Sequence, residues 1–128
     1  MLQHKHLILK GRIDRPHDGA TIARSLYDIV DIVAMKVLYP PNVVRCDELG
    51  NHGFTGVVLL TTSHMVWHDW DAEDGRSDLQ FDLYSCACFE PRDVVRFLQD
   101  RHKLHAWEYK MFDRMYAIEQ QDAQGLRT

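Results

Sequence analysis

The chain has 128 residues, 45% of them hydrophobic, and 15 Lys and Arg against 19 Asp and Glu give it a formal net charge of −4. This length fits one domain with its own core, and the lack of any Lys or Arg block argues against a nucleic-acid partner. The longest aliphatic run, Val57 to Leu60, is too short to cross a membrane, and residues 1–10 lack the apolar core of a signal peptide. We therefore expect a cytoplasmic protein without a membrane partner.

The predicted elements are short strands interrupted by two helices. We expect strands at residues 5–10, 42–49, 54–62, 79–88 and 104–112, a further strand at 64–70, and helices that begin near residue 20 and at residue 91. Residues 1–118 would form a single domain, and the polar segment 119–128 would be a frayed tail.

The first helix is predicted from the spacing of its apolar residues. These residues, which recur with a helical period, are Leu26, Ile29, Val30, Val33 and Val37. Asp18 is placed to cap the start of the helix, and Pro40 and Pro41 are expected to end it. Pro91 is typical of the first position of the second helix.

The order is roughly β-α-β-β-β-α-β, which predicts an α+β fold. We expect a two-layer sandwich in which one mostly antiparallel sheet carries two helices on one face. Several strands carry apolar residues on both faces. A partner subunit is therefore expected to cover the second face of the sheet.

A metal site is weighed first among the candidate chemistries. His64 and His68 with Cys86 and Cys88 offer suitable ligand types. On a strand, however, residues four apart lie about 13 Å from each other, too far to share one ion. We therefore expect no metal. The remaining histidines are interpreted as surface residues, and Cys86 and Cys88 as small apolar residues on one strand face.

A serine nucleophile is weighed next, at Ser63. A hydroxyl nucleophile needs a base within hydrogen-bond reach. On a regular strand Ser63 faces away from both His64 and His68, so a plain polar strand end is the simpler interpretation. For Ser63 to meet His68, the chain would have to turn near Thr62. The acidic run from Asp69 to Asp74 is read first as a solvated turn.

Five sequence segments together point to one family. These are "HLILK", "GFTGVVLL", "TTSHMVWHDWDAE", "DLYSCA" and "EPRDVVRFL", at residues 6–10, 53–60, 61–73, 82–87 and 90–98. In order and spacing they resemble the bacterial-type S-adenosylmethionine decarboxylase proenzymes, over about residues 4–114. The central segment is similar to that family's block Glu-Ser-His-x-x-x-His-Thr-Trp-Pro-Glu.

The resemblance implies an enzyme that makes its own cofactor. In that family the motif serine attacks the preceding carbonyl, the amide becomes an ester, and β-elimination leaves a pyruvoyl group. The pyruvoyl group forms a Schiff base with the substrate and accepts electrons as carbon dioxide leaves. The family acts in polyamine (spermidine) biosynthesis, and its sites form at a homodimer interface.

Residue roles follow from the resemblance, position by position. Ser63 matches the pyruvoyl precursor, so the processing site would be the bond between Thr62 and Ser63. Thr55 and His68 match residues that assist processing, and Cys86 matches the general acid of decarboxylation. The expected substrate-binding residues are Trp70, which matches an adenine-stacking aromatic, with Leu49, Glu73 and His64.

The sequence also departs from the family pattern. Thr62 stands where the family has Glu, and Ala72 aligns with the ribose-binding Glu, so that Glu73 is one residue late. Leu49 replaces an aromatic. The departures leave open a decarboxylase of S-adenosylmethionine, a drifted enzyme whose acidic run binds arginine or ornithine, a non-cleaving paralogue that acts as a binding or regulatory subunit, and a nucleoside-binding enzyme without a pyruvoyl group.

Overall fold

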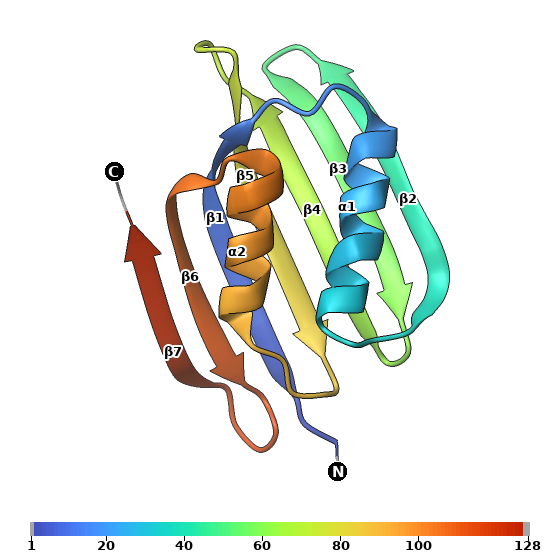
Figure 1. Ribbon diagram of the computed structural model, residues 1–128, viewed down its shortest axis with the longest axis vertical. Helices are drawn as coiled ribbons and strands as arrows, with labels where there is room; N and C mark the ends of the chain where they lie inside the picture. Colours follow the sequence, from blue (N-terminus) through green and yellow to red (C-terminus); the bar gives the residue numbers. More distant parts are fainter. Residues whose placement is uncertain (1, 127–128) are drawn as a thin grey trace.

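The protein is an antiparallel sheet of seven strands with both helices on one face (Figure 1). The computed structural model describes residues 2–126. The elements are β1 Lys5–Asp14, α1 Gly19–Ile32, β2 Val37–Glu48, β3 Asn51–Leu60, β4 Ser63–Asp71, β5 Arg76–Ser85, α2 Pro91–His102, β6 His105–Asp113 and β7 Glu119–Leu126. The strands lie in the order β2-β3-β4-β5-β1-β6-β7, which confirms the predicted two-layer α+β class.

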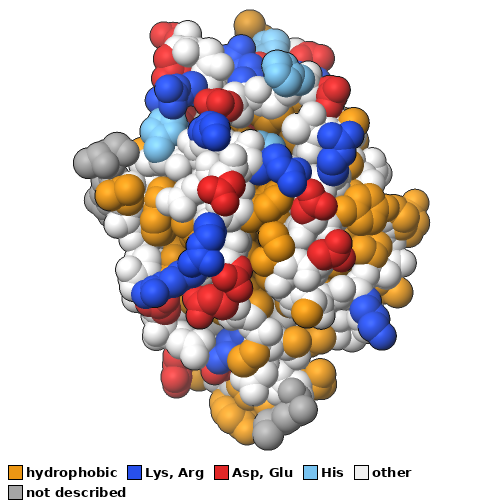
Figure 2. Space-filling model, viewed as in Figure 1, with side chains coloured by type: hydrophobic (Ala, Val, Ile, Leu, Met, Phe, Trp, Pro, Cys, Tyr) orange, Lys and Arg blue, Asp and Glu red, His pale blue; other side chains and the backbone are white. Residues whose placement is uncertain are grey.

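The core lies between the helices and the face of the sheet that they cover, here called the inner face. Alternate strand residues point into it, as the pleat requires. The buried residues include Leu7, Leu9, Val58, Met65, Trp67, Phe81 and Leu83 from the strands and Ile22, Leu26, Ile29, Val94 and Leu98 from the helices. Figure 2 shows the helix-bearing side, where charged side chains of both signs are interspersed.

The opposite face of the sheet, here called the outer face, carries no helix within residues 2–126 (Figure 1). Well-exposed apolar side chains on it include Ile8 at 49%, Val44 at 60% and Leu59 at 45%. Residues between the inner-facing ones on β4 and β5 also point to this side, among them His64, His68, Trp70 and Asp82. The sheet thus has one packed face and one available face.

The first helix is shorter than predicted. Asp18 caps it as expected, because its side chain accepts a hydrogen bond from the Thr21 N–H. The helix ends at Ile32, and Ala34 then adopts a left-handed conformation with φ 56°. Pro40 and Pro41 therefore do not end the helix: they lie within β2, an edge strand, where a missing N–H leaves no ladder bond unmade. The pairing register shifts around them.

Most of the polar segment expected to be a frayed tail, residues Glu119–Leu126, forms β7 instead, and residues 127–128 lie outside the described part of the chain. Main-chain pairing with β6 holds it, and polar side chains add contacts. Lys5 donates to Asp113 at 2.9 Å and to Gln121 at 3.0 Å, and the Tyr109 hydroxyl donates to Asp122 at 2.9 Å. Nearly every residue of this edge strand is exposed, so it needs no apolar alternation and the sequence pattern did not reveal it.

The expected further strand is also present, as β4. No helix within residues 2–126 is long and apolar enough to span a membrane.

Candidate active site

The turn between β3 and β4 has an unusual backbone. Thr62 adopts a left-handed conformation with φ 53° immediately before Ser63. A β-branched residue is strained there, because its side chain crowds the main chain. The hydroxyl oxygen of Thr62 lies 2.8 Å from the Thr61 carbonyl oxygen and 3.0 Å from Cys86 Sγ. The chain therefore does leave strand geometry at the bond that the family motif marks.

Ser63 and Cys86 contact each other directly. The backbone N–H of Cys86 donates to Ser63 Oγ at 2.9 Å, and Cys86 Sγ lies 3.4 Å from the carbonyl oxygen of Thr61. Hydrogen bonds from the hydroxyls of Ser63 and Thr62 hold the pKa of the Cys86 thiol below its usual value. We call Thr62, Ser63 and Cys86 the hairpin-end cluster.

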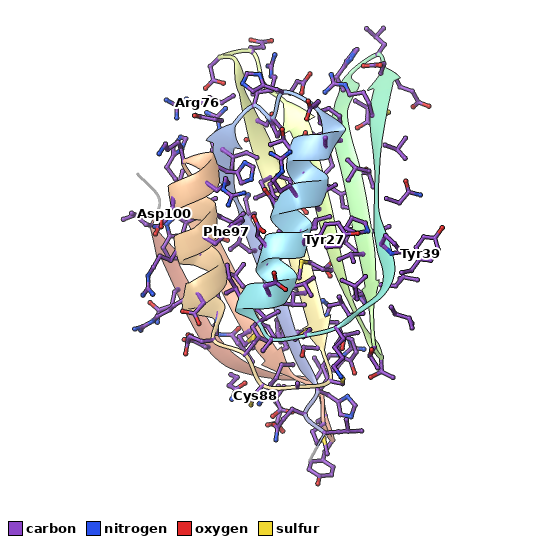
Figure 3. All side chains as sticks on the ribbon, turned by 45° about the vertical axis from the view of Figure 1, so that its right-hand side comes forward. Tyr27, Tyr39, Arg76, Cys88, Phe97 and Asp100 are labelled. Atoms are coloured by element: carbon purple, nitrogen blue, oxygen red, sulfur yellow. The ribbon has the colours of Figure 1, made fainter. Side chains whose placement is uncertain are left out.

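Cys88 does not share a strand face with Cys86, contrary to the sequence interpretation. The strand β5 ends at Ser85, whose hydroxyl donates to the Ala87 carbonyl at 2.6 Å and accepts from the Ala87 N–H at 2.9 Å. This local turn leads the chain toward α2 and leaves Cys88 exposed in the connection (Figure 3). Cys86 is therefore the cysteine beside Ser63.

Thr55 and His68 form a second polar site on the sheet. They are cross-strand partners on β3 and β4, with Thr55 Oγ1 3.0 Å from His68 Nδ1. The Trp70 ring lies beside the His68 ring, with centroids 6.1 Å apart, and its Nε1 donates to Asn51 Oδ1 at 2.8 Å. We call Thr55, His68 and Trp70 the mid-strand group. Sequence reasoning missed Asn51, which lies between the strands predicted at 42–49 and 54–62.

Within one chain the two sets of residues stay apart. Ser63 is the first residue of β4 and His68 is five positions further along it. At about 3.3 Å per residue this separates their backbones by about 16 Å. The bend at Thr62 comes before Ser63, so it does not bring Ser63 to His68.

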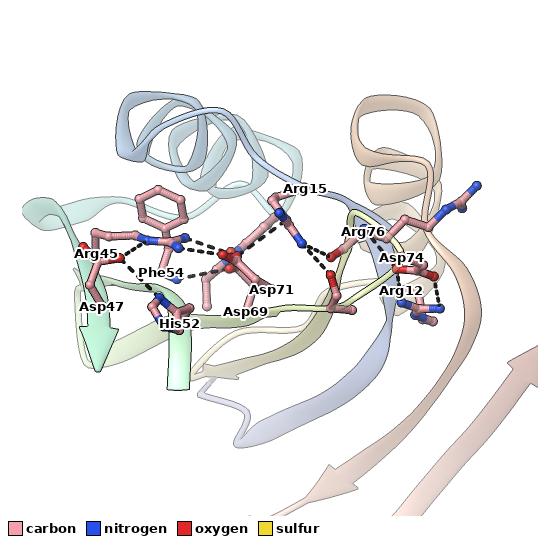
Figure 4. A network of polar contacts seen from close by, with 12 residues as sticks. Arg12, Arg15, Arg45, Asp47, His52, Phe54, Asp69, Asp71, Asp74 and Arg76 are labelled. Carbon is pink, nitrogen blue, oxygen red and sulfur yellow. Dashed lines mark hydrogen bonds and ion pairs between the residues drawn. The ribbon is translucent and has the colours of Figure 1, made fainter. Parts of the chain in front are cut away.

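The acidic run does not form an open acidic cluster. The side chain of Asp69 is buried on the inner face, where it accepts from Trp67 Nε1 at 2.8 Å and from the Phe54 N–H at 3.1 Å. Burial raises its pKa, whereas the hydrogen bond from Arg45, with Nη2 2.6 Å from Asp71 Oδ2, lowers the pKa of Asp71 (Figure 4). These partners occupy the carboxylates that a cationic substrate would need.

Of the other expected substrate-binding residues, Leu49 and Glu73 lie away from the hairpin-end cluster, whereas His64 directly follows Ser63. Leu49 is 97% exposed in the turn between β2 and β3, at the end of the sheet opposite to Ser63. Glu73 is exposed in the turn between β4 and β5. His64 points to the outer face, beside Asp82. Leu49 and Glu73 are thus nearer in the topology to Trp70 than to Ser63.

Comparisons with known proteins agree with one another. A family model described as S-adenosylmethionine decarboxylase matches residues 12–115. S-adenosylmethionine decarboxylase proenzymes from two strains of Clostridium botulinum are each 31% identical to the chain over 49 residues. These matches cover 38% of this chain and only 40% of each relative.

A solved structure matches over nearly the whole chain. The crystal structure of the adenosylmethionine decarboxylase from Aquifex aeolicus superposes with a TM-score of 0.64, covering 94% of this chain and 98% of that chain at 21% identity. At this identity the likeness establishes the shared fold.

Proposed function

The chain belongs to the S-adenosylmethionine decarboxylase family, and from this premise we propose that it is a self-processing, pyruvoyl-dependent decarboxylase. The observation that carries the proposal is the hairpin-end cluster. It combines a strained backbone at Thr62, a serine directly after it, and a thiol of lowered pKa in contact with both.

The proposed cleavage uses atoms that the turn already holds together. Ser63 Oγ attacks the carbonyl carbon of Thr62, the peptide nitrogen leaves, and an ester joins the two residues. Loss of the Ser63 α-proton then breaks the ester, releases Thr62 as a carboxylate and leaves a dehydroalanine at position 63. Water hydrolyses the imine tautomer of that residue, and its nitrogen leaves as ammonia, which gives the pyruvoyl group. Left-handed strain at a β-branched residue costs about 1–3 kcal/mol, and breaking the bond releases it. Because the electrophile is a backbone carbonyl, Thr62 in place of Glu leaves this chemistry available.

The residues at the turn also fit the group that cleavage would create. A pyruvoyl group at position 63 would lie beside the Cys86 backbone N–H and thiol, the neighbours of the serine from which it derives. Its chemistry is that of an electron sink for the carbon that loses carbon dioxide. Cys86 would supply a proton to that carbon, a task that suits an accessible thiol with a lowered pKa.

We further propose that two copies of the chain complete each site. The mid-strand group holds the histidine that processing needs, yet it lies about 16 Å from Ser63 along the same strand. The available outer face, with its exposed Ile8, Val44 and Leu59, can pack against a second copy. A two-fold arrangement places the same patch on both chains, so His68 of each copy can serve Ser63 of the other.

S-adenosylmethionine is the substrate we propose. Trp70 offers an aromatic surface for its adenine, and a ring face also attracts a sulfonium cation. The contacts of Asp69 and Asp71 weaken the basic amino acid alternative, because both carboxylates already have partners.

The second candidate is a non-cleaving paralogue that acts as a binding or regulatory subunit. One observation favours it: Thr62 Oγ1, in place of a carboxylate, contacts Cys86 Sγ at 3.0 Å and so gives the thiol a neutral partner.

Mass spectrometry of the purified chain separates the two candidates. An active proenzyme gives two products, residues 1–62 and a pyruvoyl-blocked 63–128, whereas Ser63→Ala gives only the intact chain. If the native chain shows nothing but the intact mass of 15.0 kDa after prolonged incubation, the self-processing function is wrong.

A further inference from the structure

Three side chains on the outer face converge close to Ser63, and the proposed cleavage and protonation steps use none of them. His6 comes from β1, His64 from β4 and Asp82 from β5, the strand between them. Each offers one ligand atom, and the three atoms lie within 4.8 Å of one another. We propose that His6, His64 and Asp82 bind a divalent transition-metal ion of the zinc type.

The sheet register explains the convergence. His6 and His64 both lie opposite Tyr84, one on each side of it. Asp82 is two residues from Tyr84 and therefore points to the same face. Both imidazoles reach toward this carboxylate, so the site is built from three adjacent strands and does not depend on a loop.

The distances suit coordination. His6 Nε2 and His64 Nε2 each lie 3.5 Å from Asp82 Oδ1. Ligand atoms about 2.1 Å from a tetrahedral zinc ion lie about 3.4 Å from one another. A zinc-sized ion can therefore be placed among the three ligand atoms with only small side-chain adjustments.

The polar atoms are also incompletely satisfied. His6 Nε2 and Asp82 Oδ1 are buried and have no hydrogen-bond partner among the described residues. Buried polar atoms are rarely left unpaired, because each then loses its hydration without compensation. An ordinary histidine–aspartate hydrogen bond would satisfy both atoms, but the pair does not form one. A bound ion would satisfy them together.

The donor set decides the class of ion. Two imidazoles and one carboxylate match the zinc sites in which the protein supplies three ligands and water takes the fourth position. Magnesium and calcium prefer oxygen donors alone and would be poor occupants.

One contact opposes the site in its present form. Arg114 Nη1 lies 3.3 Å from His6 Nδ1, and an arginine can only donate. That contact places the ring proton on Nε2, whereas metal binding through Nε2 needs the proton on Nδ1. Arg114 must therefore move away when the ion binds. Arg114→Gln, whose amide oxygen can accept from Nδ1–H, should bind the ion more tightly than the native chain.

Metal titration of the full chain tests the proposal. After chelator treatment, calorimetry with Zn²⁺ should show one ion per chain. His6→Gln and Asp82→Asn should each raise Kd at least about tenfold, as disturbance of metal sites generally does. The matched control His17→Gln, at an exposed loop histidine, should leave Kd unchanged. No stoichiometric uptake, equal Kd values for native and ligand variants, or loss of binding in the control would overturn the site.

Cobalt substitution provides a readout that needs no variant. Co²⁺ in the native chain should give the strong visible absorption of a four- or five-coordinate ion. The weak spectrum of six-coordinate aqueous Co²⁺, or a thiolate charge-transfer band from a cysteine, would contradict the ligand assignment. All three ligands come from one chain, and none is Ser63, so failure of self-cleavage leaves this result unaffected.

Discussion

The hairpin-end cluster and the mid-strand group differ in what holds them in place. The cluster depends on a turn: Thr62 is strained, and the contacts of Ser63 and Cys86 come from residues at or just beyond strand ends. The mid-strand group depends on regular pairing, since Thr55 and His68 are direct cross-strand partners. In the proposed reaction this difference separates two roles: backbone strain is held at the turn, and the proposed proton-transfer pair is fixed by regular strand pairing.

The largest effect is expected when two inactive variants are combined, because this tests whether the cluster and the mid-strand group act across two copies of the chain. Ser63→Ala lacks the nucleophile and His68→Ala lacks the proposed proton carrier, so neither should cleave alone. Co-expressed as mixed dimers, the His68→Ala chain should be cut, because its own Ser63 meets His68 of the other copy. Mass spectrometry identifies which chain is cut. Cleavage confined to homodimers of the native chain, with none in the mixture, would contradict a shared site.

Replacing Cys86 would separate the two chemical steps. Cys86→Ser should leave cleavage intact and lower decarboxylation of S-adenosylmethionine by about 10²–10⁴-fold, the range expected for a lost general acid. Release of labelled carbon dioxide per processed chain is the measurement. Cys88→Ser, at the exposed neighbouring cysteine, is the control and should retain full turnover. Equal losses in both variants would assign the thiol a structural role.

Relieving the strain at Thr62 should affect the hairpin-end cluster and leave the pairing of Thr55 with His68 unchanged. Thr62→Gly removes about 1–3 kcal/mol of left-handed strain from the folded state. The greater flexibility of glycine in the unfolded chain costs about 0.5–1 kcal/mol in return. In the Ser63→Ala background, the free energy of unfolding should rise by about 1 kcal/mol in urea titrations. With Ser63 present, cleavage should slow by about fivefold.

Lys103→Gly is the matched control for Thr62→Gly, since Lys103 has φ 57° just after α2, at the end of the sheet opposite to Ser63. It should give a similar gain in stability with unchanged cleavage. Faster cleavage in Thr62→Gly would show that strain does not assist the reaction.

Lowering the pH should destabilise both regions together, because a buried histidine lies in the core beneath them. Burial lowers the pKa of His102 to about 4, and its ring lies against Trp67, which stands on β4 between Ser63 and His68. The unfolded chain, with a histidine pKa near 6.5, takes up the proton first, so the stability that neutral His102 provides is lost as pH falls from about 6.5 toward 4. Urea unfolding from pH 7 to 4.5 should be less pH-dependent in His102→Gln. If the free energy of unfolding depends on pH equally in the native chain and the variant, another group causes the acid sensitivity.

The sequence predicted most of the fold because its patterns are local. The spacing of Leu26, Ile29 and Val30 placed α1, and Pro91 correctly marked the start of α2. The errors arose where tertiary context decides. Val37 continues the helical spacing but belongs to β2, because Ala34 turns the chain first. The strand β7 is held by its pairing with β6, which its polar composition does not encode.

The candidate site was harder to predict from the sequence than the fold, for a physical reason. Motif order identified Ser63, Thr62 and Cys86, and the structure brings these three together. Strand periodicity could not place Cys86, because β5 ends one residue before it. The convergence of His6, His64 and Asp82 was invisible in the sequence, since it depends on which strands are neighbours.

The two prolines in β2 have a consequence for assembly. An edge strand with free N–H and C=O groups can add strands from other molecules without limit, as fibres do. Neither Pro40 nor Pro41 has a backbone N–H to offer to an added strand, and the register shifts beside them distort this edge of the sheet. Sideways growth is therefore obstructed at that edge, whereas the proposed pairing through the outer face would end after two copies. An obstructed edge together with the proposed pairing favours a closed particle over an open-ended polymer.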